Sequence, residues 1–193
     1  MKNISLYTKE INNMARRVAK FEKVTYGQFE KDWVDAFNVP ELDTANKREI
    51  ESIYEAITLP KRATKFSAGY DFVSPRTFIL NPGETIKIPT GIRCGMNTDW
   101  VLMIYPRSGL GFKYQINLCN EVGIVDADYY FSNNEGHIFV KLVNRGDKSV
   151  YINLGDAFAQ GIFMEYGITE DDRVEASRNG GFGSTDKNKK EWC

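Results

Sequence analysis

The sequence contains few of the residues that disulfide, metal or histidine chemistry requires. Its 193 residues include three cysteines and one histidine. The cysteines, Cys94, Cys119 and Cys193, are odd in number and widely spaced, which argues against a disulfide framework and against a zinc site. The single His137 excludes chemistry that needs two imidazoles, and it weakens any catalytic triad built on histidine.

Long apolar segments are also lacking. No run of about 18 apolar residues occurs, so no membrane span is expected, and the first residues lack the apolar segment of a signal peptide. A formal net charge of −1 gives no sign of a general nucleic-acid binder. Because the thiols are predicted to be free, we expect a cytoplasmic protein of one domain, with or without an appendage.

Residues 1–58 are predicted to form a helical N-terminal extension. Apolar residues recur near a helical period up to Phe21, and Asp43 or Thr44 could cap a later helix whose apolar face ends at Ile57. Between them, aromatic residues recur every fourth position: Phe29, Trp33 and Phe37. The simpler interpretation is an appendage packed on the main domain. The alternative is a docking surface for a protein partner.

Residues 59–174 show a strand pattern instead. Short apolar or alternating runs cover residues 85–88, 100–105, 138–143, 150–154 and 157–164, with turn-like residues between several of them. Short strands at this spacing are typical of an antiparallel barrel or sandwich. Residues 175–193 lose all periodicity and contain a cluster of glycines, which predicts a flexible C-terminal arm.

Two stretches contain residues suited to nucleotide chemistry. In residues 106–113, Arg107 and Ser108 stand beside glycines, which let backbone N–H groups approach a phosphate closely. In residues 120–129, an apolar run ends at Asp126, which can accept a proton, and at Tyr129, which can stack on a sugar. For either stretch alone, a hairpin with a glycine turn and solvated aspartates is the simpler interpretation.

Together with three further blocks, these stretches resemble the motifs of the trimeric dUTPase family. The five blocks occur in the family's order at residues 68–72, 106–109, 123–129, 155–160 and 180–185. The resemblance implies a mainly β, distorted jelly-roll barrel that hydrolyses dUTP to dUMP and pyrophosphate. It does not extend to the helical segment, which resembles the extension of some bacterial or phage-type relatives.

The resemblance also implies roles for individual residues. Asp126 matches the aspartate that activates the attacking water, Asp71 matches a supporting aspartate, and Tyr129 matches the ring under the deoxyribose, which excludes a 2′-hydroxyl. Asp128 matches no catalytic position. The positions implied to contact phosphate are Arg107, Ser108, Gly109 and Gln160. The positions implied to hold uracil are Asn120, Gly123, Ile124, Val125 and Phe139.

The predicted arm resembles the family's fifth motif, which covers the uracil and holds the γ-phosphate. The matching residues are Arg178, Phe182, Gly183, Ser184 and Thr185. Two departures affect this match: Arg178 lies one residue closer to the glycine pair than in many relatives, and Asp186 adds a negative charge near the γ-phosphate. Before Phe139, residues 131–137 form an insertion that is predicted to be a surface loop or a partner contact.

Partners and alternatives follow from the same resemblance. It implies Mg²⁺ bound mainly through the triphosphate and water, without a dense cluster of protein ligands, and a homotrimer in which one subunit's arm closes a site built by others. A dCTP deaminase shares the fold but would require an Arg-Ser-Ser motif and a nearby glutamate base. A regulatory binding protein switched by nucleotide is the second alternative, with residues 1–58 and 131–137 as candidate contacts.

Overall fold

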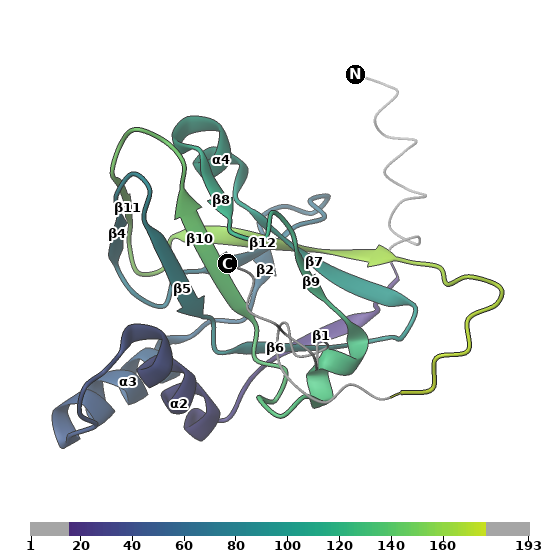
Figure 1. Ribbon diagram of the computed structural model, residues 1–193, viewed down its shortest axis with the longest axis horizontal. Helices are drawn as coiled ribbons and strands as arrows, with labels where there is room; N and C mark the ends of the chain where they lie inside the picture. Colours follow the sequence, from purple (N-terminus) through teal and green to yellow (C-terminus); the bar gives the residue numbers. More distant parts are fainter. Residues whose placement is uncertain (1–15, 177–193) are drawn as a thin grey trace, which may run out of the picture.

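The computed structural model describes residues 16–176, which form a mainly β protein (Figure 1). This part of the chain contains twelve strands, three α-helices and one 3-10 helix. In chain order they are β1 (Ala19–Lys23), α2 (Tyr26–Phe37), α3 (Thr44–Ala56), β2 (Lys61–Arg62), β3 (Tyr70–Val73), β4 (Phe78–Leu80), β5 (Thr85–Pro89), β6 (Ile92–Met96), β7 (Trp100–Pro106), α4 (Ser108–Tyr114), β8 (Ile116–Leu118), β9 (Gly123–Val125), the 3-10 helix η1 (Ala127–Phe131), β10 (Phe139–Asn144), β11 (Val150–Ile152) and β12 (Ala157–Glu165).

The strands pair into antiparallel sheets. The largest has the order β2-β3-β12-β7-β9, a three-stranded sheet has the order β5-β10-β8, and two pairs join β1 to β6 and β11 to β4. β12 is the centre of the largest sheet, because it pairs with β7 from Ala159↔Pro106 to Glu165↔Trp100 and with β3 on its other side. This pairing brings the ends of three strands that carry predicted site residues next to one another.

The apolar faces of these strands pack together and form the main hydrophobic core. Phe72, Leu102, Val140 and Phe158 come from four different strands, and each is at most 2% exposed. Along β10 the exposed Lys141 lies between buried Val140 and Leu142, as the alternating pattern predicts. The predicted strands at residues 85–88, 100–105, 138–143, 150–154 and 157–164 correspond to β5, β7, β10, β11 and β12.

Two of the helices predicted in residues 1–58 are confirmed. In α2 the Thr25 hydroxyl caps the first turn, accepting from the Gln28 backbone N–H at 3.3 Å, and the Asp43 carboxylate caps α3 in the same way. The aromatic positions spaced by four face inward, and they form a second hydrophobic cluster with its own buried residues: Val24, Phe29, Trp33 and Ile50. Figure 1 shows α2 and α3 together at one end of the molecule, outside the sheets.

The helix prediction for residues 1–58 is wrong at Ala19–Lys23, which form β1. This strand pairs with β6 from Ala19↔Met96 to Lys23↔Ile92. Its Phe21 ring packs 5.4 Å from the Tyr70 ring and 5.8 Å from the Phe72 ring, measured between centroids, so it joins the main core. Pairing and packing with distant residues therefore override the local periodicity. Residues 1–15 lie outside the described residues.

One further local expectation needs correction. The insertion at residues 131–137 is not simply a surface loop. Its first residue, Phe131, is the last residue of η1, and Ser132 and His137 are buried. Asp128 lies within η1 and does not continue the strand that ends at Val125. This short helical turn follows β9 and directs the chain back towards the core.

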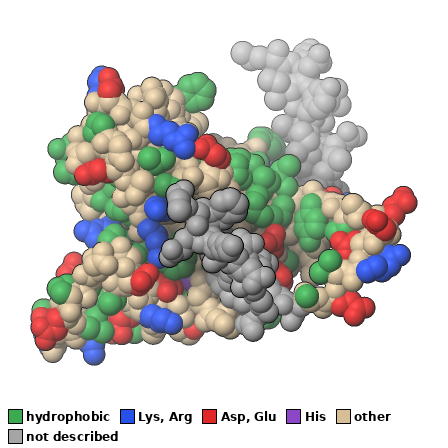
Figure 2. Space-filling view, in the orientation of Figure 1, with side chains coloured by type: hydrophobic (Ala, Val, Ile, Leu, Met, Phe, Trp, Pro, Cys, Tyr) green, Lys and Arg blue, Asp and Glu red, His purple; other side chains and the backbone are tan. Residues whose placement is uncertain are grey.

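The surface of the described residues is mixed in charge. Lys, Arg, Asp and Glu side chains are interspersed over the face seen in Figure 2, in line with the formal net charge of −1. Within residues 16–176, no helix has the length and apolar character needed to cross a membrane.

Candidate active site

A pocket of about 530 Å³ opens beside β10 and β9. Its lining contains three of the residues that the sequence assigns to the base: Asn120, Gly123 and Phe139. The other lining residues are Lys87, Ile104, Leu118, Cys119, Asn134, Val140 and Lys141. The pocket combines an apolar floor with amide groups and two lysines, a composition suited to a flat polar ligand that carries negative charge.

Strand pairing explains why these residues meet. Gly123 pairs with Ile104 across β9 and β7, and a Cβ atom built on Gly123 would lie 3.1 Å from the Ile104 Cβ. A larger residue at position 123 would therefore press against the strand and narrow the pocket. Of the two neighbours predicted to contact the base, Ile124 is 44% exposed, whereas Val125 points into the core at 1% exposure.

Asp126 directly follows β9 and occupies the N-cap position of η1 with extended backbone. This arrangement confirms the expected strand that ends at a carboxylate. Tyr129 lies within η1 and is only 1% exposed, so its ring belongs to the core of this chain. Its hydroxyl donates to the His137 carbonyl at 2.7 Å and accepts from the Asn134 amide at 2.8 Å.

A second group of predicted site residues lies where β3, β7 and β12 run side by side. Arg107 Nη1 donates to Asp71 Oδ1 at 2.7 Å, and the Gln160 side-chain amide donates to the Pro106 carbonyl at 3.3 Å. The ion pair is partly buried, since the Asp71 side chain is 17% exposed. A Cβ atom on Gly69 would lie 2.5 Å from Gln160 Oε1, so glycine at position 69 leaves room for this amide.

Ser108 and Gly109 begin the short helix α4, directly after Arg107. The helix ends at Tyr114, and its C-cap residue Gln115 has a left-handed backbone conformation with φ 55°. Residues 106–109 therefore form the corner between β7 and α4, and not the glycine turn of a hairpin. This corner presents the Arg107 guanidinium, the Ser108 hydroxyl and the backbone N–H of Gly109 from one short segment.

The two groups of site residues do not line the same pocket among residues 16–176. Arg107, Asp71 and Gln160 are absent from the described lining of the pocket around Asn120 and Phe139. Sequence reasoning also missed several lining residues. Lys87 and Lys141 face each other in the β5–β10 register, so strand pairing alone could have placed them together. Asn134 belongs to the insertion, which has no counterpart in the motifs.

Arg178, Phe182, Gly183, Ser184 and Thr185 all lie outside residues 16–176. Within that range, no group of three or more His, Cys, Asp or Glu side chains is spaced to hold a metal ion. The two cysteines of this range are free thiols, Cys94 in the core and Cys119 at the pocket. Burial raises the pKa of the Cys94 thiol to about 12.

Comparison with known proteins identifies the family. A family model for dUTPase matches residues 55–186. The deoxyuridine 5′-triphosphate nucleotidohydrolase of Lactococcus lactis subsp. lactis is 42% identical over 132 residues, which cover 67% of this chain and 88% of the relative. The enzyme of the same name from Haemophilus influenzae is 39% identical over 137 residues, 67% of this chain and 87% of the relative.

Solved structures agree with the sequence relatives. The dUTPase from Streptococcus mutans has a TM-score of 0.52 at 38% identity, covering 58% of this chain and 88% of that chain. A dUTPase from phage phi11 of S. aureus, described with a structural Mg(II) ion, has a TM-score of 0.51 at 24% identity, covering 62% of this chain and 90% of that chain. The second likeness supports the fold alone.

Fold and relatives together define a hydrolase of nucleoside triphosphates. The chain belongs to the dUTPase family. Its reaction is the hydrolysis of dUTP to dUMP.

Proposed function

We propose that this chain cleaves dUTP by attack of a water molecule on the α-phosphate, with Asp126 as the base that orients the water and takes its proton. The supporting observation is the place of Asp126, which immediately follows the strand whose first residue, Gly123, lines the pocket. A carboxylate oxygen can orient a water molecule and accept its proton as the water attacks. The products are dUMP and pyrophosphate.

The pocket is proposed to hold the uracil. Asn120 and the backbone of Gly123, Ile124 and Val125 offer hydrogen-bonding groups, and Phe139 offers an apolar wall. Tyr129 is proposed to support the deoxyribose. Because its ring is almost fully buried in this chain, that support consists of the segment that its hydroxyl holds in place.

The corner at residues 106–109 is proposed to bind the phosphates. The Asp71 carboxylate fixes one terminal nitrogen of Arg107, which leaves the planar guanidinium pre-oriented for phosphate oxygens. The Ser108 hydroxyl and the Gly109 N–H add donors, and Gln160 lies on the adjacent strand. Charge that develops on the phosphate oxygens is stabilised best by donors held in place before the reaction.

Mg²⁺ is proposed as the cofactor. Asp71 and Arg107 lie together at the proposed phosphate corner, and Mg²⁺ usually keeps several waters and binds through substrate phosphates. When bound, the ion would neutralise phosphate charge, and Asp71 would support its water shell. These residues orient the substrate, while the proton of the attacking water goes to Asp126.

A homotrimer with shared sites is proposed for the assembly. Arg107 does not line the base pocket within the described residues of one chain. A second copy of the chain can therefore complete each site. The arm that carries Phe182, Ser184 and Thr185 is proposed to close it. We further propose that the reaction takes place in the cytoplasm, where thiols such as Cys119 stay reduced.

The test measures pyrophosphate release from dUTP, dCTP, dTTP and UTP by the wild type and by Asp126→Asn. The wild type should strongly prefer dUTP, and the variant should lose roughly 100-fold or more in kcat while still binding dUTP, because Asn keeps the shape but accepts no proton. A variant that turns over dUTP within a few-fold of the wild type contradicts the role of Asp126. Ammonia release from dCTP would indicate a deaminase instead.

A further inference from the structure

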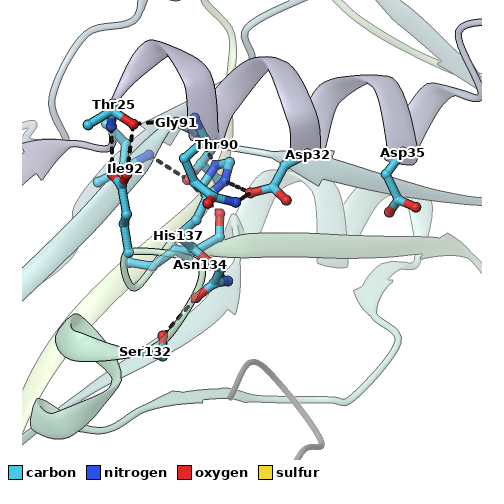
Figure 3. Close-up of polar contacts among 12 residues, drawn as sticks. Thr25, Asp32, Asp35, Thr90, Gly91, Ile92, Ser132, Asn134 and His137 are labelled. Atoms are coloured by element: carbon cyan, nitrogen blue, oxygen red, sulfur yellow. Dashed lines mark hydrogen bonds and ion pairs between the residues drawn. The ribbon is translucent and has the colours of Figure 1, made fainter. Parts of the chain in front are cut away.

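The single histidine connects helix α2 with the region of the pocket. His137 is 0% exposed, and its Nδ1 lies 2.6 Å from Asp32 Oδ2 on α2. Its Nε2 accepts from the backbone N–H of Gly91 at 2.7 Å. Figure 3 shows the Asp32 carboxylate directed from α2 at the imidazole. α2 precedes residue 55, where the match to the dUTPase family begins.

These contacts define the protonation of the ring. An Nε2 that accepts from Gly91 carries no hydrogen, so the hydrogen is on Nδ1 and is donated to Asp32. Burial alone would raise the pKa of Asp32, but hydrogen bonds from His137 and from the Gln28 amide outweigh it and hold that pKa below its ordinary value. Without the Asp32 carboxylate, the buried Nδ1–H would lose this acceptor.

His137 in turn holds residues at the pocket. Its ring packs against the ring of Phe139, with centroids 4.6 Å apart. Its carbonyl accepts from the Tyr129 hydroxyl at 2.7 Å, and Asn134 donates to that same hydroxyl. Phe139 and Asn134 both line the pocket. A shift of His137 would therefore move two lining side chains and release the hydroxyl of the proposed sugar support.

A second contact joins α2 to the same segment. The Glu135 carboxylate accepts from the Thr25 backbone N–H at 2.8 Å and from the Thr25 hydroxyl at 2.7 Å. Thr25 is the N-cap of α2, so the start of the helix and its Asp32 both bind residues 131–137. The insertion thus touches α2 at two points separated by about two helical turns.

We propose that Asp32 is a positioning residue for dUTP binding: through His137 it holds the pocket wall formed by Asn134 and Phe139. The N-terminal helix α2 thereby sets the affinity of the pocket without touching the substrate. This inference rests on the proposed placement of uracil in the pocket. Asp32 acts on the pocket wall through His137, whereas Arg107 of the proposed phosphate corner is held separately by Asp71, so the effect falls on binding more than on turnover.

Asp35 provides a matched control, because it lies one turn further along α2. Its carboxylate is 3.0 Å from the Lys87 ammonium, and its side chain is 73% exposed. Since Lys87 itself lines the pocket, removal of Asp35 changes the charge near the substrate at least as directly as removal of Asp32. It leaves His137 untouched, however, so the pair separates positioning from simple electrostatics.

The experiment compares Asp32→Ala, Asp32→Asn and Asp35→Ala in the full chain. We expect Asp32→Ala to raise the KM for dUTP, and the Kd of a non-hydrolysable dUTP analogue, about tenfold with kcat changed by less than about threefold, since an orphaned buried donor is costly. Asp32→Asn keeps an acceptor for His137 and should restore most of the affinity. Asp35→Ala should stay within about twofold of the wild type.

Hydrogen exchange provides a readout that does not depend on activity. Asp32→Ala should accelerate exchange in residues 132–139 and leave β7 and β12 unchanged. Acceleration throughout the chain, or none in this segment, would overturn the proposal, as would equal effects of Asp32→Ala and Asp35→Ala on KM. If Asp32→Ala does not fold, Glu135→Ala takes its place: a KM raised several-fold supports the proposal, and a KM within twofold overturns it.

The outcomes separate this inference from the function on which it rests. A wild type that hydrolyses dUTP, together with an Asp32→Ala variant of unchanged KM, overturns the role of α2 alone. A wild type that neither binds the dUTP analogue nor releases pyrophosphate overturns the proposed function and this inference with it.

Discussion

Replacement of Phe21 by alanine tests whether β1 is an integral part of the fold. Phe21 is half-buried on β1, and its ring lies between three aromatic rings, with centroids 5.4 Å from Tyr70, 5.8 Å from Phe72 and 5.7 Å from Phe163. These partners belong to β3 and β12, the strands that also carry Asp71 and Gln160. The substitution therefore removes the main apolar contact between residues 16–25 and the largest sheet.

The expected cost follows from burial and ring geometry. A fully buried Phe→Ala substitution costs about 3–5 kcal/mol, and well-oriented aromatic pairs contribute about 0.5–1.5 kcal/mol each within such totals. Because Phe21 is only half-buried, we expect Phe21→Ala to lower the free energy of unfolding by about 2–3 kcal/mol. For a chain of this length that loss corresponds to a fall in Tm of roughly 4–12 °C.

Urea unfolding measures the effect most directly. The midpoint and the slope are recorded for both proteins at one protomer concentration, because assembly adds a concentration-dependent term. Phe112→Ala is the control, since the Phe112 ring is 93% exposed in the described chain. That variant should unfold within about 0.5 kcal/mol of the wild type.

Equal unfolding free energies for Phe21→Ala and Phe112→Ala would refute the reasoning. That result would mean that β1 does not hold its place on the sheet, and that residues before Tyr26 form a loosely attached appendage after all. A change in slope without a change in midpoint would also contradict it, because a lost native contact lowers the midpoint.

Two further predictions concern charge and the arm. Hydrogen bonds from Lys20 and Tyr130 lower the pKa of Glu22 from 4.5 to about 2, so the stability this carboxylate contributes is present above pH 4.5 and is lost as the pH falls towards 2. Glu22→Gln should remove that part of the acid dependence, at most about 1 kcal/mol for a carboxylate 31% exposed, in unfolding curves taken from pH 5 to pH 2; identical pH slopes would contradict it. A chain ending at Glu175 should keep its trimer mass in light scattering but lose most turnover, because Phe182 and Ser184 are removed; full activity of that chain would exclude a role for the arm.

Periodicity and capping in the sequence predicted those elements whose own residues determine them. The spacing of Phe29 and Trp33 predicts the buried face of α2, and Asp43 predicts the start of α3 by its capping chemistry. Alternation likewise predicts β10. β1 was missed because its partner β6 lies about seventy residues away, and no local pattern reports such a pairing.

The candidate site was predictable to the extent that it follows the family motifs. Asn120, Gly123 and Phe139 line one pocket, as their implied contact with uracil predicts, whereas the ion pair of Arg107 with Asp71 was not predicted. The lysine pair at the pocket, Lys87 and Lys141, belongs to no motif and follows only from the register of β5 against β10. Prediction from family motifs therefore finds the residues to which the family gives a role. It misses residues that meet only because two strands pair, such as Lys87 and Lys141.

His137 shows why a lone residue can be misjudged from sequence. One histidine in the chain excludes a pair of imidazoles, and that exclusion says nothing about a structural use. The structure buries the ring between Asp32 and the Gly91 amide, where a neutral imidazole can donate on one side and accept on the other. No apolar side chain meets both needs, so a buried polar residue is favoured here. The acceptor lies 105 residues away on α2. The buried histidine is therefore explained only by the contact between the helix and the insertion.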